Sequence, residues 1–429
     1  MSFLGSASGV GRVGKALLQH RVIAATAGAG TAVLVVGCAF AATSSNGSGH
    51  ETLANVSNNK PAASTTTTTH HVTTKAKVAA VAPLKVVSVT PSSGAHDANG
   101  ADPITVKFSS PLSPQTPLPT LSPSVKGSWQ VSGDTATFTP ATGFLADTTV
   151  KVTVPAGADG MLAASGSAGT LKQTSVTSFT TGSYSTLRLQ QLLAQLGYLP
   201  LTWTPSDPST GTVAASDANA QLAAAYDAPA GTFTFNSGYP SSLTSQWSVG
   251  TDNVLVSGAV RAFENNIGLT MDGDAGPEVW SSLLTAVAKN QTNPNGYSYA
   301  LATQGSSNEA LQIWHDGKRV LVTPANTGIP ASPTPDGTFP VYLKYTVTQM
   351  KGFNPDGTKY DDTVYWASYF NGGDAVHAFP RPGYGWYQSL GCVEIPYNGS
   401  GPGVAENAYN YLTYGSLVTV TGALVFRPR

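Results

Sequence analysis

Residues 389–396 read Ser-Leu-Gly-Cys-Val-Glu-Ile-Pro and hold one of only two cysteines in the 429-residue chain. The other, Cys38, lies 354 positions earlier, so the two cysteines predict neither a disulfide framework nor a four-ligand zinc site. Cys392 therefore needs an explanation of its own. A thiolate is a good nucleophile, but an ordinary thiol, with a pKa near 8.5, needs a neighbouring imidazole or positive dipole to form one. His377 is the candidate imidazole, because His315 is expected on an exposed hairpin turn.

Short alternating runs surround this segment and predict a β-rich domain. Residues 310–314 and 319–322 flank the turn His-Asp-Gly-Lys, and Asp-Gly between two alternating runs is a strong hairpin signal. Further apolar and aromatic runs at 341–345, 364–366 and 376–378 predict more strands.

Four motifs occur in this order along the chain: Thr327-Gly328, Thr-Pro-Asp-Gly-Thr-Phe at 334–339, Val376-His377 and Ser389-x-Gly391-Cys392. Together with an aromatic strand, their order resembles the L,D-transpeptidase catalytic domain of bacterial cell walls, over residues 298–422. The resemblance implies a β-rich catalytic domain at 298–425.

The same resemblance implies roles for individual residues. Cys392 would be the nucleophile and His377 the base, with the imidazole oriented by the backbone carbonyl of Ala378. Gly391 and Ser389 would provide backbone support, and N–H groups around Gly391 and Cys392 would form the oxyanion hole.

The chain departs from the family pattern in three places. Leu390 replaces a secondary histidine beside the nucleophile. Glu394 stands where Arg or Asn is usual, and it would contact either a substrate amine or a cation of the protein. The stretch between His377 and Ser389 is short, which predicts a trimmed lid. Four of its side chains could line the cleft, although the three aromatic ones could instead pack in the core: Arg381, Tyr384, Trp386 and Tyr387.

The function that the resemblance implies is 3→3 cross-linking of peptidoglycan. Cys392 would attack a tetrapeptide stem, release the terminal D-Ala and pass the acyl group to the side-chain amine of a neighbouring stem. Neither a metal nor an organic cofactor is implied. Two alternatives stay open: an L,D-carboxypeptidase in which water is the acceptor, and a non-catalytic wall-binding protein.

Two further domains are predicted upstream. Residues 83–182 contain short strands between turn residues and predict an Ig-like β-sandwich that acts as a spacer. Residues 184–290 contain a Leu-Gln helix ending in Leu-Gly-Tyr and a second helix followed by Gly-Leu, Asp-Gly and Trp. They resemble a small helical peptidoglycan-binding domain with an insertion at about 200–250, which implies binding to peptidoglycan glycan and stem peptides.

The N-terminal region predicts export from the cytoplasm. Residues 1–43 combine a basic flank with an uncharged run, as in a signal peptide or a membrane anchor. Val-Val-Gly-Cys at 35–38 also resembles a lipobox, which would make Cys38 a lipid attachment site. Residues 44–82 are rich in Ser and Thr and predict a disordered linker. Together these features predict an extracytoplasmic protein tethered to a membrane at the cell wall.

The composition agrees with a mainly β, multidomain protein and argues against nucleic-acid binding. Charged residues make up 10% of the chain, while 45 Gly and 29 Pro favour strands and turns. The formal net charge is −1, without a block of basic residues, whereas nucleic-acid binding normally needs a cationic face.

Overall fold

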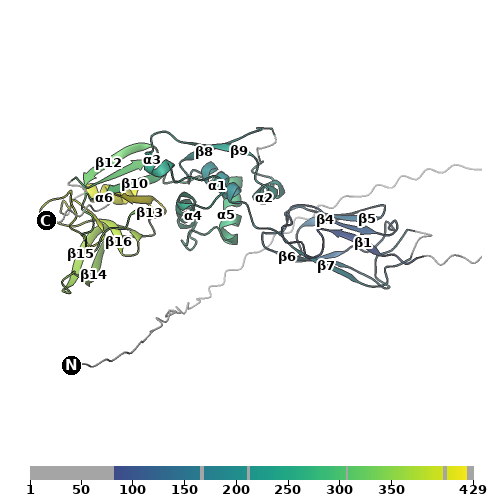
Figure 1. Cartoon of the computed structure of the whole chain (residues 1–429). Helices are drawn as coiled ribbons and strands as arrows, with labels where there is room; N and C mark the ends of the chain where they lie inside the picture. The colour runs from purple at the N-terminus through teal and green to yellow at the C-terminus, as the bar shows by residue number, and fades with distance from the viewer. Residues whose placement is uncertain (1–81, 165–168, 210–212, 306–307, 400–402, 423–429) are drawn as a thin grey trace, which may run out of the picture. The chain divides into compact units, whose positions relative to one another are not determined.

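The computed structural model describes residues 82–164, 169–209, 213–305, 308–399 and 403–422. All of them belong to the unit of residues 77–429, and this unit contains more strand than helix, which confirms the mainly β prediction (Figure 1). The predicted anchor with Cys38, and the predicted linker up to residue 81, lie outside the described residues. No helix in the described ranges is both long enough and apolar enough to span a bilayer.

Residues 84–182 form two antiparallel sheets, in the region where short strands were predicted. The first has the order β1 (Val86–Thr90), β2 (Ile104–Phe108), β5 (Thr135–Pro140), β4 (Gly127–Ser132), and the second the order β3 (Thr120–Ser122), β6 (Thr149–Val154), β7 (Ser175–Thr180). Alternation along strands such as β2 and β6 buries one face, so that Val106 of β2 and Val152 of β6 share one core. The two sheets therefore pack face to face through apolar side chains.

The next region is mainly helical. Its elements are α1 (Thr186–Gln195), β8 (Leu201–Pro205), α2 (Ala218–Tyr226), β9 (Gly231–Phe235), α3 (Ser241–Thr244), α4 (Val254–Ile267) and α5 (Pro277–Ala288). Ser185 caps α1 and Asn253 caps α4, each through a side-chain oxygen that accepts backbone N–H groups. Gly268 ends α4 with a φ of 76°, a left-handed value that glycine adopts without steric cost.

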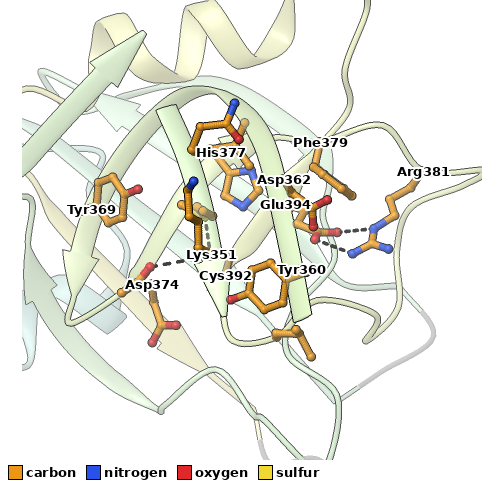
Figure 2. A pocket seen from close by; sticks show the side chains of 15 residues that line it. Lys351, Tyr360, Asp362, Tyr369, Asp374, His377, Phe379, Arg381, Cys392 and Glu394 are labelled. Carbon is orange, nitrogen blue, oxygen red and sulfur yellow. Dashed lines mark hydrogen bonds and ion pairs between the residues drawn. The ribbon is translucent and has the colours of Figure 1, made fainter. Parts of the chain in front are cut away.

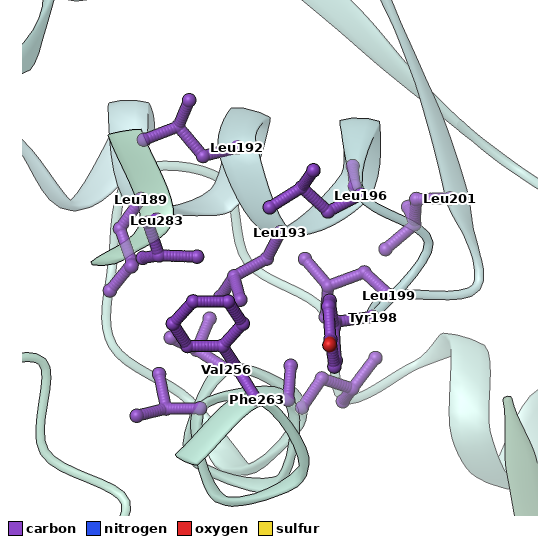
Figure 3. Close-up of a cluster of buried hydrophobic side chains, with 14 of the residues drawn as sticks. Leu189, Leu192, Leu193, Leu196, Tyr198, Leu199, Leu201, Val256, Phe263 and Leu283 are labelled. Carbon is purple, nitrogen blue, oxygen red and sulfur yellow. The ribbon is translucent and has the colours of Figure 1, made fainter. Parts of the chain in front are cut away.

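The insertion at 200–250 contributes to the core of this helical region. Its strands β8 and β9 pair antiparallel, and Leu201 and Leu243 are buried in the same cluster as α1 and α4. Figure 3 shows Leu193 of α1 pointing toward Phe263 of α4, and the ring of Tyr198 meets that of Phe263 edge-on, with the ring centroids 5.4 Å apart. The cluster continues into the C-terminal region through Tyr299.

The C-terminal region has two sheets. The first has the order β12 (Lys318–Pro324), β11 (Ala310–His315), β10 (Ser298–Thr303), β18 (Leu417–Thr421), β13 (Gly337–Pro340), and the second the order β14 (Leu343–Phe353), β15 (Lys359–Asn371), β16 (Asp374–Ala378), β17 (Val393–Ile395). Helix α6 (Val404–Tyr411) follows β17. One apolar core contains side chains from both sheets and from α6, so the second sheet is fixed against the first.

Two sequence predictions can be compared with these strands. The hairpin between β11 and β12 turns at Asp316 and Gly317, whose φ values of 45° and 75° are those that an Asp-Gly turn requires, as predicted. The strand expected at 341–345 instead begins at Leu343 and continues to Phe353. Val341 lies outside it because its N–H donates to Ser416 O and its side chain is buried in the core.

Replacing Phe263 by Ala is expected to destabilise the helical region by about 3–5 kcal/mol, because the ring is 1% exposed and its removal leaves a cavity. Urea denaturation followed by the helical circular dichroism signal measures the change. Ile267→Ala, on the same helix but 41% exposed, is the control and should change the free energy of unfolding by less than about 1 kcal/mol. Equal losses in the two variants would show that Phe263 is not part of a packed core.

Candidate active site

The parallel pairing of β16 with β17 places two chemically reactive side chains on one face of the second sheet. Val376 is the partner of Val393 in this ladder, and both side chains lie in the core between the sheets. Side chains of a strand alternate between its two faces. His377 follows Val376 and Cys392 precedes Val393, so both point away from the core toward the opposite face.

A cavity of about 340 Å³ lies on that face and is lined by both His377 and Cys392 (Figure 2). The hairpin of β14 and β15 provides much of its wall. The lining residues are Gln349, Met350, Lys351, Tyr360, Asp362, Val364, Tyr369, Gly373, Asp374, His377, Phe379, Arg381, Leu390, Cys392 and Glu394. In the described parts of the chain, no group of three or more His, Cys, Asp or Glu side chains is arranged to hold a metal ion.

The imidazole of His377 is held in one orientation. Its Nδ1 lies 3.1 Å from the carbonyl oxygen of Ala378 and donates to it, since a carbonyl can only accept. This leaves Nε2 as the nitrogen with a free lone pair. Burial lowers the pKa of His377, more strongly than the carbonyl and Glu394 raise it. The ring is therefore neutral near pH 7 and able to accept a proton.

The thiol of Cys392 is also neutral. Burial raises its pKa to about 12, and the negative charges of Asp374 and Glu394 act in the same direction. Its Sγ lies 3.9 Å from the carbonyl oxygen of Gly373 and 3.9 Å from Sδ of Met350. The raised pKa of the Cys392 thiol and the lowered pKa of the His377 imidazole thus both favour the neutral forms of the two groups.

A short hydrogen-bonded turn fixes Cys392. The hydroxyl of Ser389 donates to the carbonyl oxygen of Cys392 at 2.6 Å and accepts the N–H of Gly391 at 3.2 Å. Gly391 has a φ of 119°, and a Cβ built there would lie 2.3 Å from Oδ1 of Asp374. Only glycine fits that backbone position without movement of Asp374.

A buried carboxylate supports this turn from behind. Oε2 of Glu309, a residue that is 1% exposed, accepts both the N–H and the hydroxyl of Thr327 at 2.8 Å. The carbonyl oxygen of Thr327 in turn accepts the N–H groups of Gln388 and Ser389 at 2.9 Å. Glu309 is thus two hydrogen bonds away from the turn that carries Cys392.

Glu394 forms an ion pair inside the protein. Nε and one terminal nitrogen of Arg381 lie 2.8 and 2.6 Å from its two carboxylate oxygens, and Asn326 donates to it at 3.3 Å. Of the two partners considered for Glu394 from the sequence, the structure has the protein cation. The pair also raises the pKa of Arg381.

Tyr384 and Trp386 differ from the prediction that they line the cleft. The hydroxyl of Tyr384 donates to Phe379 O at 2.6 Å, and Trp386 is 44% exposed. Neither contributes to the cavity wall. The reason is that Gly385, between them, donates to Ala325 O and accepts from Glu309 N, which turns this segment away from the cavity.

Sequence reasoning missed the wall of the cavity formed by β14 and β15. The trimmed-lid prediction considered only the stretch between His377 and Ser389, whereas this hairpin supplies side chains such as Tyr360 and Asp362. Asn-Pro-Asp-Gly at 354–357 is a strong turn signal between two alternating runs, and it could have revealed the hairpin. Asp374 was missed because it is brought beside Cys392 only by the strand pairing.

Comparisons with known proteins match two separate parts of the chain, which agrees with the multidomain prediction. Residues 300–420 match the model of the L,D-transpeptidase catalytic domain, and residues 80–181 match that of a bacterial Ig-like domain. Residues 300–420 are thus similar to L,D-transpeptidase catalytic domains. The resemblance of residues 184–290 to a peptidoglycan-binding domain stays a prediction, and no curated protein matches the chain significantly.

Several solved L,D-transpeptidases are similar to the chain. The catalytic domain from E. faecium has 28% identity over 29% of this chain and 96% of its own, with a TM-score of 0.26. An L,D-transpeptidase from Mycobacterium smegmatis has 16% identity over 79% of this chain and 100% of its own, with a TM-score of 0.25. L,D-transpeptidase 3 from Mycobacterium tuberculosis, in complex with a faropenem-derived adduct, has 16% identity over 79% of this chain and 98% of its own, with a TM-score of 0.26.

Alkylation of Cys392 by iodoacetamide is expected to accelerate about tenfold per pH unit from pH 7 to 9.5. Because burial raises the thiol pKa to about 12, the thiolate fraction keeps rising across this whole range. Mass spectrometry of the peptide that contains Cys392 gives the rate at each pH. A rate that reaches a plateau below pH 8 would instead indicate a preformed thiolate–imidazolium pair.

Replacing Arg381 by Gln is expected to cost about 3 kcal/mol of stability, because it leaves the carboxylate of Glu394, which is 4% exposed, without its cation. Glu394→Gln and the double variant complete a thermodynamic cycle measured by urea denaturation. The matched control is Lys351→Gln, which breaks an exposed ion pair with Asp361 and should cost less than about 1 kcal/mol. Additive effects of the two Arg381 and Glu394 substitutions would mean that the pair is not coupled.

Proposed function

We propose that this protein is a peptidoglycan L,D-transpeptidase that forms 3→3 cross-links through a thioester on Cys392. The observation that carries the proposal is the cavity shared by His377 and Cys392, within residues that match the L,D-transpeptidase catalytic domain. The neutral imidazole and the neutral thiol have the protonation states that general-base activation of the thiol needs.

In the proposed acylation step, the sulfur of Cys392 attacks the carbonyl carbon of the third residue of a tetrapeptide stem. Nε2 of His377 takes the thiol proton as the new C–S bond forms. The tetrahedral adduct then expels the terminal D-Ala, whose nitrogen receives that proton from His377. Because the N–H of Gly391 already donates to Ser389, the N–H of Cys392 is the better candidate for the oxyanion hole.

In the second step, the side-chain amine of a neighbouring stem attacks the thioester carbonyl. The C–S bond breaks, an amide bond forms, and the sulfur regains a proton that the attacking amine releases through His377. The hairpin of β14 and β15, which walls the cavity, would restrict the access of water to the thioester. Arg381 has a positioning role in this scheme: its ion pair with Glu394 holds the cavity wall next to His377.

We further propose that the catalytic domain works outside the cytoplasm, at the cell wall. The basic flank and uncharged run in residues 1–43 support either an N-terminal anchor or a lipoprotein attached at Cys38, and the helical residues 184–290 would hold peptidoglycan. Membrane fractionation of cells expressing Cys38→Ala distinguishes the N-terminal anchor from the lipoprotein, since only a lipoprotein needs that cysteine to stay at the membrane.

The purified full-length chain, incubated with a disaccharide-tetrapeptide, is expected to produce a muropeptide dimer that has lost one D-Ala. Cys392→Ala should abolish the dimer, and His377→Gln should slow its formation by about 10²–10⁴-fold, the usual contribution of a general base. Mass spectrometry quantifies the dimer and the Cys392 adduct. Trp386→Ala, at an exposed position outside the cavity, is the control and should retain activity.

Other products would change the functional assignment. Monomeric tripeptide without dimer would indicate an L,D-carboxypeptidase, in which water is the acceptor. Neither product nor Cys392 adduct would contradict both enzymatic functions and favour a protein that only binds the wall.

A further inference from the structure

Some of the charged side chains that line the cavity form ion pairs and others do not. Of its two cations, Arg381 is paired with Glu394, and Lys351 is paired with Asp361, which lies outside the cavity. Among the described residues, Asp374 forms no ion pair, and its only side-chain hydrogen-bond partner in the protein is Asn371. Two lining carboxylates thus form no ion pair in the described residues: Asp362, whose charge acts on Arg381 and His377, and Asp374, whose pKa no cation perturbs.

Asp374 lies at a defined place beside the thiol. It begins β16, three residues before His377, and its Oδ1 packs against Gly391, the residue that precedes Cys392. Figure 2 shows Asp374 on one side of Cys392, and Glu394 with Arg381 on the other side. Asp362 and Glu394 therefore act on the cation Arg381 at one end of the cavity, whereas Asp374 lies at the other end without a cation, and the sulfur lies between the two ends.

Cys392 lies between two ends of the cavity that differ in their charged side chains, and this arrangement suits a reaction with two substrates. An acyl donor and an acyl acceptor must reach the same carbonyl carbon from different directions. The acceptor of the proposed reaction is a primary amine, which is protonated at neutral pH and cannot attack until it loses a proton. An uncompensated carboxylate attracts an ammonium group and can accept its proton.

We propose that Asp374 binds the ammonium group of the acyl acceptor and takes its proton before the amine attacks the thioester on Cys392. The proposal rests on the proposed transpeptidase function and assigns a second proton acceptor to the same site. The acceptor's ammonium first gives one proton to the carboxylate of Asp374. The neutral amine then forms the C–N bond, the C–S bond breaks, the amine's second proton reaches the sulfur through His377, and Asp374 releases the first proton to solvent.

The titration of Asp374 fits this role. Partial burial raises its pKa to about 6, more strongly than Asn371 lowers it. The titratable groups that face it are Cys392, Tyr342 and Tyr360, and all three are neutral near pH 7 because their own pKa values are raised. Asp374 is thus mostly ionised at pH 7 yet basic enough to hold a proton briefly.

Asp374→Asn in the full-length protein separates the two half-reactions. The probes are a disaccharide-tetrapeptide as donor and a disaccharide-tripeptide with a free side-chain amine as acceptor. We expect the Cys392 thioester to form within about threefold of the wild-type rate, while the ratio of dimer to hydrolysed tripeptide falls by at least about tenfold. Asp374→Glu should restore part of the ratio, and Asp361→Asn, outside the cavity, should leave it unchanged.

The pH dependence adds a readout that a structural role would not move. In the wild type, the rate of aminolysis should rise as Asp374 loses its proton through pH 6 and then level off. In Asp374→Asn it should keep rising toward the pKa of the acceptor amine, because only the free amine can then attack. An unchanged ratio and profile in Asp374→Asn, or a loss of thioester formation together with a lower melting temperature, would overturn the role of Asp374.

Failure of the underlying function gives a different result. If the wild type forms no thioester, the transpeptidase function is wrong and the role of Asp374 is rejected with it. If the wild type forms the thioester and releases only hydrolysed tripeptide, the acyl chemistry stands and an amine-binding Asp374 is rejected.

Discussion

The pairing of two short parallel strands is the constraint on which the site depends. In the β16–β17 ladder, Val376 lies opposite Val393 and Ala378 opposite Ile395, and all four side chains belong to the buried core. A shift of this register by one residue would turn the apolar side chains out and the reactive ones in. The same core that stabilises the domain thus determines where its histidine and cysteine point.

Hydrogen bonds fix the turn that carries Cys392, which the strand pairing does not hold. Cys392 lies just before β17, where the ladder no longer holds it, and Ser389 closes this turn from both sides. Behind it, Glu309 is a carboxylate that three donors satisfy without a cation: the N–H groups of Gly305 and Thr327 and the Thr327 hydroxyl. A buried charge with several donors is costly to displace, so the turn is supported by a rigid base.

Much of this organisation could be predicted from the sequence because it is local. Alternating runs and an Asp-Gly turn indicate strands and a hairpin, and Ser389-x-Gly391-Cys392 together with His377 indicates the site. What could not be predicted depends on contacts between distant segments. The partner of Glu394 is 13 residues away in sequence and is set by a loop, and Asp374 reaches its position only when β16 and β17 pair.

The wall of the cavity illustrates the same limit. The run after Leu343 is largely exposed, so its length as a strand comes from pairing with β15 rather than from its own burial. The turn at 354–357 predicts a hairpin, but no sequence pattern tells that this hairpin covers Cys392.

The high pKa of the Cys392 thiol has a consequence for the lifetime of the protein. Oxidants such as peroxide react with the thiolate far faster than with the thiol, and the first product can proceed to sulfinic and sulfonic acids that are not repaired. Burial keeps almost all of Cys392 protonated near pH 7. In oxidising surroundings, a nucleophile of this kind is preserved between turnovers and becomes reactive only while a bound partner draws its proton to His377.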